Sequence, residues 1–476
     1  MGIGTHEDAR TDRKQVRSSG GEGGRFRREL RTPGLTLLTL GGVMGSGIFL
    51  ASGLVIQHAG PAALVVFAVA AVGMYLEIMA LAEMSAADPT PGSFLVYSAR
   101  VLGPGFTFVG GWIYWFSSVL TMSSEVTAAS LFMQLWFPNI PIWIWAFVYS
   151  TGVVGINFLA VRGFGQIEAV MAGVKTLAIA GFVVLGISWA LGLVRSGPTI
   201  LPLWSNLSRG GPFWPHGVGG AAPALLLALF AFAGTGVIGM AAAETREPSK
   251  TIPQAARQTV LLVTVLYLVS IFFVLELVPW STVPTTHSPF VAAVAATGIA
   301  GLGTVMNVAL LFAVLSTMNA ALYANVRVLY SLARQGQAPK SLGRLNRQGQ
   351  PTAAIWTSAA LLGMTIILAY VLPHKAYSYL VTATGFQAMF VWLMILWTQI
   401  HYRPYLEHHH PNGLPLRLRL YPYSTIACIL LVVLALAFSP LASGELVGAI
   451  VGFGGICVAA LVWIMLRHRL RRSVQD

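Results

Sequence analysis

The chain has 476 residues, of which 56% are hydrophobic and only 9% are charged, and its mean hydropathy is +0.72. Because soluble domains carry about a quarter charged residues, this composition excludes a soluble globular protein and indicates an integral membrane protein. The net charge of +13 would also suit a nucleic-acid-binding protein, so its distribution along the chain has to decide between the two. Cys428 and Cys457 both lie in apolar runs, which argues against a disulfide framework.

Hydropathy predicts twelve membrane-spanning helices, each long enough to cross roughly 30 Å of hydrocarbon. In chain order they are Leu35–Ile56, Ala62–Met84, Phe106–Gln134, Ile142–Val161, Ile167–Leu193, Ala221–Ala243, Val260–Val278, Thr304–Leu332, Ala354–Leu372, Tyr377–Tyr402, Thr425–Leu441 and Val447–Met465. The apolar segment Ser288–Gly303 and the eighth span are together too long for one crossing. We therefore expect a separate helix in this segment, lying across the outer mouth of the protein.

Lysine and arginine set the predicted orientation. The N-terminal tail, the loops that follow even-numbered spans and the C-terminal tail hold 25 of the 29 lysines and arginines. Arg195, Arg209 and Lys375 lie on the opposite side, and Lys175 lies inside the fifth span. This asymmetry predicts that both termini are cytoplasmic and that the number of spans is even. The predicted location is the plasma membrane. Because the bias follows loop parity, it accounts for the net charge without a nucleic-acid partner.

The first span contains an unusual load of glycine. The stretch from Gly41 to Gly53 reads GGVMGSGIFLASG, with five glycines. Glycine costs about 1 kcal/mol relative to alanine in a helix interior, so Gly45-Ser46-Gly47 is expected to open the helix. Within a bilayer, unpaired backbone groups are tolerated only where they are buried in protein or line a cavity, and there they can bind a solute.

The sixth span repeats this feature. Phe230 to Ala243 reads FAFAGTGVIGMAAA, with Gly234, Gly236 and Gly239 in mid-span. Two glycine-interrupted helices five spans apart, entering the membrane in opposite senses, predict an inverted five-plus-five repeat with a site at the midplane. The half-helix N-termini would suit a carboxylate. The alternative is that the glycines only let helices pack closely.

The repeat divides the chain into five predicted parts. They are a disordered basic tail over residues 1–34, a first five-helix unit over 35–193, a second over 194–402, helices eleven and twelve over 403–466, and a C-terminal tail over 467–476.

Other motifs predict no enzyme and no metal site. Gly234 to Gly239 matches G-x-G-x-x-G, but a dinucleotide fold needs a βαβ unit that this apolar stretch does not provide. The run His408-His409-His410 lacks a second ligand cluster. The sequence contains no H-E-x-x-H, G-x-S-x-G or nucleotide-binding P-loop. It also shows no charged pore ring or large ligand domain, which makes a channel or receptor an unfavourable alternative.

Further segments complete a pattern with the two glycine-rich spans. They are Ala82–Met84 with Pro91–Phe94, Glu125–Ala128, Glu244 with Glu247–Pro253, Ser288–Phe290, Ser316–Arg334 and Gly336–Pro339. In these segments the chain resembles the amino acid permeases of the amino acid–polyamine–organocation (APC) superfamily, most closely its amino acid transporter family. The resemblance covers nearly the whole membrane region. It implies an all-α membrane protein with a LeuT-like five-plus-five inverted repeat and two C-terminal helices, which takes up an amino acid or amine by using an ion gradient.

The resemblance also implies a substrate site between the broken spans. The backbone around Ser46 and Gly47 would bind the substrate carboxylate, and carbonyls near Phe230 and Ala233 would bind its amino group. Phe230 stands where related transporters place an aromatic gate, although ordinary packing is the alternative. The residues assigned to substrate binding are Gly45, Ser46, Gly47, Ile48, Glu125, Phe230, Phe232, Ala233, Gly234, Thr235, Ser316 and Asn319.

Lys175 is expected to lie deep in the fifth span, where burying a charge costs at least about 2.5 kcal/mol. It therefore needs a partner, a cavity or the loss of its proton. Proton-coupled relatives carry a lysine at the matching place, where sodium-coupled relatives hold a cation against the first span. We hypothesise that Lys175 replaces sodium and couples transport to protons. The alternative is a structural ammonium that caps carbonyls of the first span.

Carboxylates inside the spans are the remaining candidates. Glu125 could contact the substrate amino group, bind a proton or hold helices in place. Glu77 is similarly deep, but no motif gives it a role. Glu244 with Arg246 and Lys250 is predicted to form a gate network at the cytoplasmic end of the sixth span.

One departure from the family pattern bears on the substrate. Close relatives have a glutamate two residues after the glycine that corresponds to Gly234, whereas this chain has Gly236. A mechanism that rests on that carboxylate is therefore in doubt here, and a neutral amino acid is favoured over lysine or arginine. The predicted function is import of an amino acid by proton symport with alternating access, with an exchanger as the alternative. The predicted partners are the small-molecule substrate and the lipid bilayer, with no cofactor beyond the coupling proton; the oligomeric state stays open.

Overall fold

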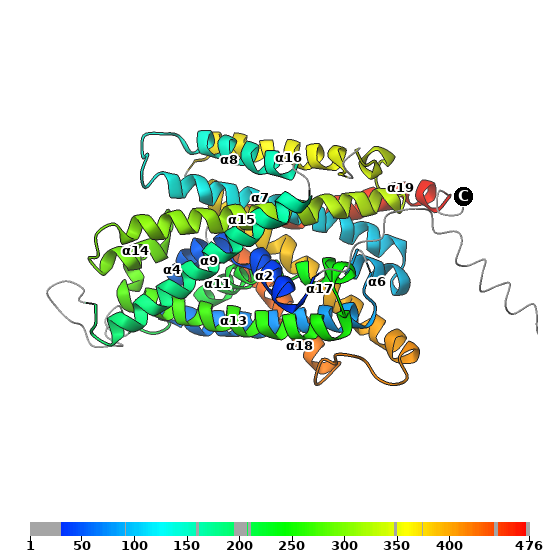
Figure 1. The fold of residues 1–476 in the computed structure, drawn as a ribbon, viewed down its shortest axis with the longest axis horizontal. Helices are drawn as coiled ribbons and strands as arrows, with labels where there is room; N and C mark the ends of the chain where they lie inside the picture. The colour runs from blue at the N-terminus through cyan, green and yellow to red at the C-terminus, as the bar shows by residue number, and fades with distance from the viewer. Residues whose placement is uncertain are drawn as a thin grey trace, which may run out of the picture.

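The computed structural model describes residues 30–90, 92–158, 161–194, 207, 211–346, 350–373, 375–441 and 446–472, and most of these residues are helical (Figure 1). The helices are α2 (Thr32–Val43), α3 (Ser46–Phe49), α4 (Ala51–Ala59), α5 (Ala63–Ala87), α6 (Phe94–Val101), α7 (Pro104–Met133), α8 (Ile142–Asn157), α9 (Val161–Ala190), α11 (Gly217–Ala231), α12 (Val237–Met240), α13 (Pro248–Leu277), α14 (Pro289–Ala296), α15 (Leu302–Arg334), α16 (Thr352–Val371), α17 (Ala376–His409), α18 (Tyr423–Phe438) and α19 (Leu446–Arg472). Each predicted span coincides with helical structure. The first span is divided among α2, α3 and α4, and the sixth is divided between α11 and α12.

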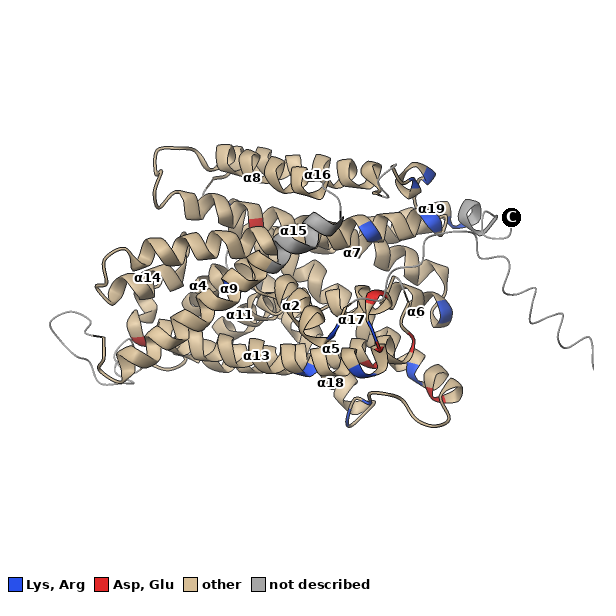
Figure 2. Cartoon of the chain, viewed as in Figure 1, with Lys and Arg blue, Asp and Glu red and all other residues tan. Residues whose placement is uncertain are grey.

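Length and composition make this a multi-pass membrane protein. Seven helical segments among the described residues are long and apolar enough to cross a membrane, and shorter apolar helices accompany them. Helices α9, α16 and α19 expose large apolar side chains such as Leu177, Trp356 and Ile464, as helices that face lipid do. Figure 2 shows that lysine and arginine gather toward the end of the bundle where α6 and the C-terminus of α19 lie.

The helix boundaries follow from local chemistry. Helix α2 begins at Thr32, three residues before the predicted start, and Pro33 occupies its first turn, where the missing N–H of proline costs no hydrogen bond. Residues 1–29 of the predicted disordered tail lie outside the described residues. The segment predicted as a separate helix before the eighth span forms α14. Ser288 caps α14 by accepting a hydrogen bond from the Phe290 N–H, and it donates one to the Phe49 carbonyl at 2.7 Å.

The two interrupted spans pack against each other in the interior of the helix bundle. Helix α11 packs along α3 and α4, and α12 packs against α2 and α5. Around this pair, α15 lies against α7 and α9, while α13 and α17 both lie against α5. The interrupted spans are therefore enclosed by helices, and their free backbone groups have to find partners on those helices.

Candidate functional site

The first span breaks at Met44 and Gly45. The N–H groups of these two residues donate to the Leu40 and Val43 carbonyls at 3.1 and 3.0 Å, after which α3 starts at Ser46. The turn leaves the carbonyls of Gly41 and Met44 and the N–H of Ser46 without partners in the helix ladder. All three are satisfied by side chains from other helices, so the break is an interior polar site rather than a packing defect.

Glu125 of α7 caps the new helix. The Ser46 N–H donates to both carboxylate oxygens, at 3.0 Å to Oε1 and 2.9 Å to Oε2, and the Ser46 hydroxyl donates to Oε1 at 3.0 Å. A negative charge at a helix N-terminus is favourable because the unpaired N–H groups and the helix dipole face it. A Cβ on Gly45 would lie 2.4 Å from Oε1, so only glycine leaves room for this approach.

Lys175 and Thr317 satisfy the carbonyls on the other side of the break. The Lys175 ammonium is fully buried and donates to the Gly41 carbonyl and, at 3.3 Å, to the Thr317 hydroxyl. The Thr317 hydroxyl in turn reaches the Met44 carbonyl at 3.0 Å. The ammonium is also close enough to Glu125 for a favourable electrostatic interaction. Sequence analysis predicted Lys175 and Glu125 separately, and the structure places them on two sides of one turn.

The second break lies between α11 and α12. Residues 232–236 form turns, and Gly234 has a φ of +101°, a conformation that favours glycine. A Cβ on Gly234 would also lie 2.2 Å from the Gly42 carbonyl oxygen, so the two interrupted spans cross in backbone contact. Thr235 is buried, and its hydroxyl donates to Glu77 Oε2 of α5 at 2.6 Å. Gly47 lies against the backbone of Ala231 at the end of α11.

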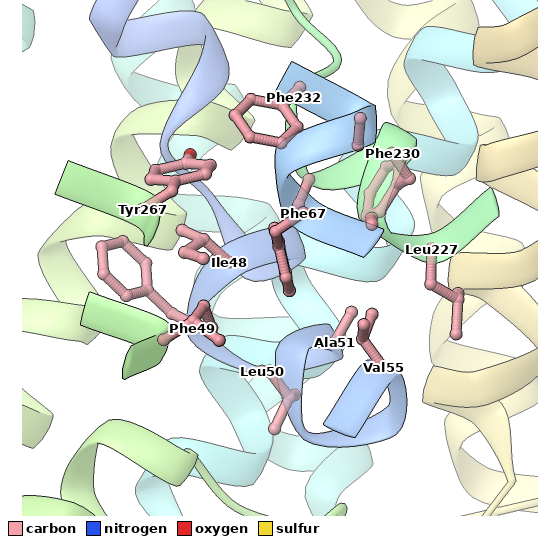
Figure 3. Packing of buried hydrophobic residues seen from close by; sticks show 14 of the residues in the cluster. Ile48, Phe49, Leu50, Ala51, Val55, Phe67, Leu227, Phe230, Phe232 and Tyr267 are labelled. Atoms are coloured by element: carbon pink, nitrogen blue, oxygen red, sulfur yellow. The ribbon is translucent and has the colours of Figure 1, made fainter. Parts of the chain in front are cut away.

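Aromatic side chains fill the space beside the breaks. Phe230 and Phe232 are both buried, and Figure 3 shows them gathered with Ile48 and Phe67. The Phe232 ring packs against Tyr267 of α13 with a centroid distance of 5.0 Å and against Phe67 of α5 at 6.2 Å. Phe230 is thus in contact with the site, and its role as a gate stays a prediction.

The remaining predicted substrate residues are distributed around this centre. Ser316 and Asn319 of α15 are buried, and Asn319 Oδ1 accepts a hydrogen bond from Asn157 Nδ2 of α8 at 2.8 Å. Ile48 is fully buried in the core, whereas Ala233 is partly exposed.

The ion pairs of Glu244 and Lys250 differ from the predicted ones, and the role of these residues as a gate stays a prediction. Glu244 pairs with Arg327 of α15 at 2.8 Å rather than with Arg246, and Lys250 pairs with Glu247. The Arg246 side chain is exposed, and its backbone N–H donates to the Leu30 carbonyl at 2.8 Å beside the β-bridge between Leu30 and Thr245. The Arg327 guanidinium lies 3.7 Å from the Tyr323 ring centroid.

A small cavity reaches inward from this ion pair. It has a volume of about 20 Å³ and is lined by Leu38, Val237, Met240, Ala241, Glu244, Ala320, Tyr323, Ala324 and Arg327. A water molecule fits such a volume, whereas an amino acid does not.

Several residues that hold the breaks were not predicted from the sequence. Thr317, next to the predicted Ser316, bridges the carbonyls of the break, and Tyr377 of α17 donates its hydroxyl to the Ser46 carbonyl at 3.0 Å. Glu77, which had no predicted role, holds the second break. The only available signal for these residues was their polarity inside apolar spans.

These features define a class: a multi-pass helical membrane protein whose interior holds polar and charged groups at two helix breaks. Comparison with known proteins gives the family. The family model "Amino acid permease" matches residues 34–469. The uncharacterized amino acid permease YtnA of Bacillus subtilis is 34% identical over 409 residues, covering 85% of this chain and 88% of that protein. The gamma-aminobutyric acid permease of the same organism is 32% identical over 441 residues, covering 92% of this chain and 94% of that protein.

The aromatic amino acid transport protein AroP of Escherichia coli (strain K12) is 32% identical over 412 residues, covering 86% of this chain and 88% of that protein. The chain therefore belongs to the amino acid permease family of the APC superfamily, as its motifs predicted. It is a membrane transporter of the amino acid permease type and not an enzyme.

Proposed function

We propose that this permease imports a neutral amino acid across the plasma membrane together with a proton. It does so by alternating access in a LeuT-like fold of twelve spans, with both termini in the cytoplasm. The two interrupted spans form the halves of the substrate site, as broken helices do in transporters of this architecture. The charge bias of the loops supports the orientation.

The observation that carries the proposal is the hydrogen bonding of the Ser46 N–H to both oxygens of the Glu125 carboxylate. A substrate carboxylate would require the same donors, because they lie at a helix N-terminus inside the bundle and have no partner in the helix ladder. When the substrate takes them, Glu125 loses its hydrogen bonds while remaining buried. A buried carboxylate without donors is costly, so it takes up a proton. Substrate binding and proton uptake then proceed together, as symport requires.

Lys175 supports protons over sodium as the coupling ion. Its ammonium already occupies the Gly41 carbonyl and the Thr317 hydroxyl, which are the oxygen ligands that a small cation at this break would need. It also keeps a positive charge beside Glu125 while the site is empty. An ammonium that only caps these carbonyls is the structural alternative, and it would make the same contacts. A transport measurement on a Lys175 variant therefore has to decide between the two roles.

The aromatic surroundings support a neutral substrate. Phe230, Phe232 and Tyr267 form an apolar wall beside the breaks. Gamma-aminobutyric acid and aromatic amino acids, named for two relatives, are therefore the first candidates, together with the other neutral amino acids. In the proposed orientation the Glu244–Arg327 pair would separate the site from the cytoplasm.

Two measurements test the proposal. A thermal-shift screen of the purified protein with the twenty amino acids and gamma-aminobutyric acid identifies a ligand, because a compound that binds the native state raises its melting temperature. Uptake of that ligand into proteoliposomes, with and without an inward proton gradient, then tests the coupling. Accumulation that follows the proton gradient and is unchanged when sodium is replaced by choline supports symport. Uptake that requires internal substrate would instead establish an exchanger, and no shift with any compound would contradict the proposal.

A further inference from the structure

Glu77 is a buried carboxyl that the proposed transport cycle does not use. It lies near the middle of α5 (Ala63–Ala87), and its side chain is fully buried. Its Oε2 accepts the hydrogen bond from the Thr235 hydroxyl at 2.6 Å, whereas its Oε1 accepts no hydrogen bond from the described residues. Among the described residues, the turn of the second break therefore supplies the one hydrogen bond that the carboxyl accepts.

The groups that face Glu77 provide no positive charge. Tyr114 of α7 and Cys428 of α18 are the titratable groups that interact with it electrostatically. Among the described residues, α11, α13 and α17 place no lysine or arginine against it. An isolated carboxylate in the interior of a membrane protein costs several kcal/mol, and it avoids that cost by binding a proton.

The two breaks are built alike in one respect. At each break a hydroxyl residue directly follows a glycine, Ser46 after Gly45 and Thr235 after Gly234, and it donates to a glutamate from a bracing helix. Glu125 at the first break has the ammonium of Lys175 nearby, and Glu77 at the second break has no such partner among the described residues. The carboxyl at the first break therefore has a positive charge nearby that offsets the cost of ionisation, and the carboxyl at the second break does not.

We propose that Glu77 is a second proton-binding site of the transporter, distinct from Glu125. It holds a proton while the turn over residues 232–236 rests on it, and it releases the proton when the turn withdraws and water reaches the carboxyl. In the release, the carboxylic O–H bond breaks, the proton passes to water, and a carboxylate remains. The role of this site in transport rests on the proposed function, but its protonation can be measured without any substrate.

The turn itself offers a way to test this site. A Cβ on Gly236 would meet only the Tyr114 ring, with its nearest atoms at 3.8 and 3.9 Å. Gly236 is the neighbour of Thr235, whose hydroxyl contacts Glu77, and a glutamate introduced at Gly236 has room for its first carbon. The double variant Glu77→Gln with Gly236→Glu therefore moves the carboxyl from α5 to the turn.

Infrared spectroscopy of the purified protein in lipid detects the proton directly. A protonated, buried carboxylic acid gives a C=O stretching band above the amide region that shifts in deuterated water. We expect Glu77→Gln to remove one such band and Glu125→Gln to leave it in place. Thr235→Val should move the band to higher frequency because it deletes the hydrogen bond. The double variant should restore a band. Spectra of the parent and Glu77→Gln that match in this region would overturn the proposal.

Thiol labelling tests the link to the turn. The substitution Met240→Cys, at a residue of α12 that lines the small cavity, is introduced together with Cys457→Ser. The alkylation rate at mildly alkaline pH is divided by the rate at mildly acidic pH for each protein. We expect this ratio to be at least about two-fold larger in the parent than in Glu77→Gln, because deprotonation of Glu77 favours withdrawal of the turn. The intrinsic pH dependence of the thiol cancels in this comparison. If the alkylation rate rises with pH by the same factor in the parent and in Glu77→Gln, the coupling of Glu77 to the turn is overturned, whatever the substrate of the transporter is.

Discussion

Replacing Gly45 with alanine tests the geometry of the first break. The added Cβ would lie 2.4 Å from Glu125 Oε1, 2.9 Å from Thr317 Cγ2 and 3.0 Å from Glu125 Cδ. The backbone at Gly45 is extended, with φ −129° and ψ −152°, so alanine meets no conformational strain there. The entire effect therefore comes from the contact with the carboxylate and the threonine that hold the break.

The size of the effect follows from the distances. To reach ordinary van der Waals contact, Oε1 has to move by roughly 1 Å. Oε1 lies 3.0 Å from both the Ser46 N–H nitrogen and the Ser46 hydroxyl, so such a shift breaks at least one of these bonds. Hydrogen bonds to charged groups contribute about 1.5–3 kcal/mol each. We expect the free energy of unfolding to fall by about 2–3 kcal/mol, and uptake to fall by about 30- to 150-fold if the same geometry is needed in transport.

Melting temperature in detergent and uptake into proteoliposomes measure the two effects. Gly181→Ala in α9 is the matched control, because a Cβ there meets no atom within 4 Å. Because alanine favours a helix interior over glycine, this control substitution should raise the free energy of unfolding by up to about 1 kcal/mol. If Gly45→Ala melts and transports like Gly181→Ala, then the carboxylate does not occupy the helix N-terminus and the proposed competition with substrate is refuted.

Three further substitutions probe the other contacts. Lys175→Met should abolish accumulation driven by a proton gradient while exchange persists, and it should add the infrared band of a protonated Glu125; retained accumulation would contradict a coupling role. Thr317→Val leaves a buried carbonyl of the break without its donor, so the melting temperature should drop by an amount that corresponds to about 1–3 kcal/mol. Glu244→Gln breaks a partly exposed ion pair worth at most about 1 kcal/mol, and it should speed alkylation of a cysteine at Met240 by no more than about five-fold. Glu247→Gln, whose pair with lysine is exposed, serves as its control and should leave the rate unchanged.

The helices and the two breaks could be predicted because their signals are local. A window of apolar residues measures the burial of a span in lipid directly, and glycine weakens a helix wherever it stands. The coincidence of both breaks with Gly45 and Gly234 follows from these short-range effects. The twelve-span topology and the repeat stay predictions, because they depend on the position of the membrane rather than on the helices alone.

The partners of the breaks could not be predicted because they depend on helix rotation. On α15 a change of one residue turns the side chain by about 100°, so Thr317 rather than Ser316 meets the Met44 carbonyl. Polarity alone does not fix that rotation, since both residues are polar. Glu244 was assigned to its neighbour Arg246 for a similar reason: the sequence shows only nearby charges, whereas Arg327 approaches from another helix.

The two carboxyls at the breaks differ chiefly in their distance from Lys175. Both are buried, and both accept from a hydroxyl that follows a glycine. Burial alone would therefore protonate both. The ammonium beside Glu125 offsets part of the cost of its charge, and in the proposed cycle that charge holds the Ser46 N–H until a substrate carboxylate replaces it. Glu77 faces no such ammonium among the described residues, which is why we propose that it holds its turn as a neutral acid. Exchanging protons at the two breaks then requires their surroundings to change in opposite senses, which alternate opening of the two interrupted spans would produce.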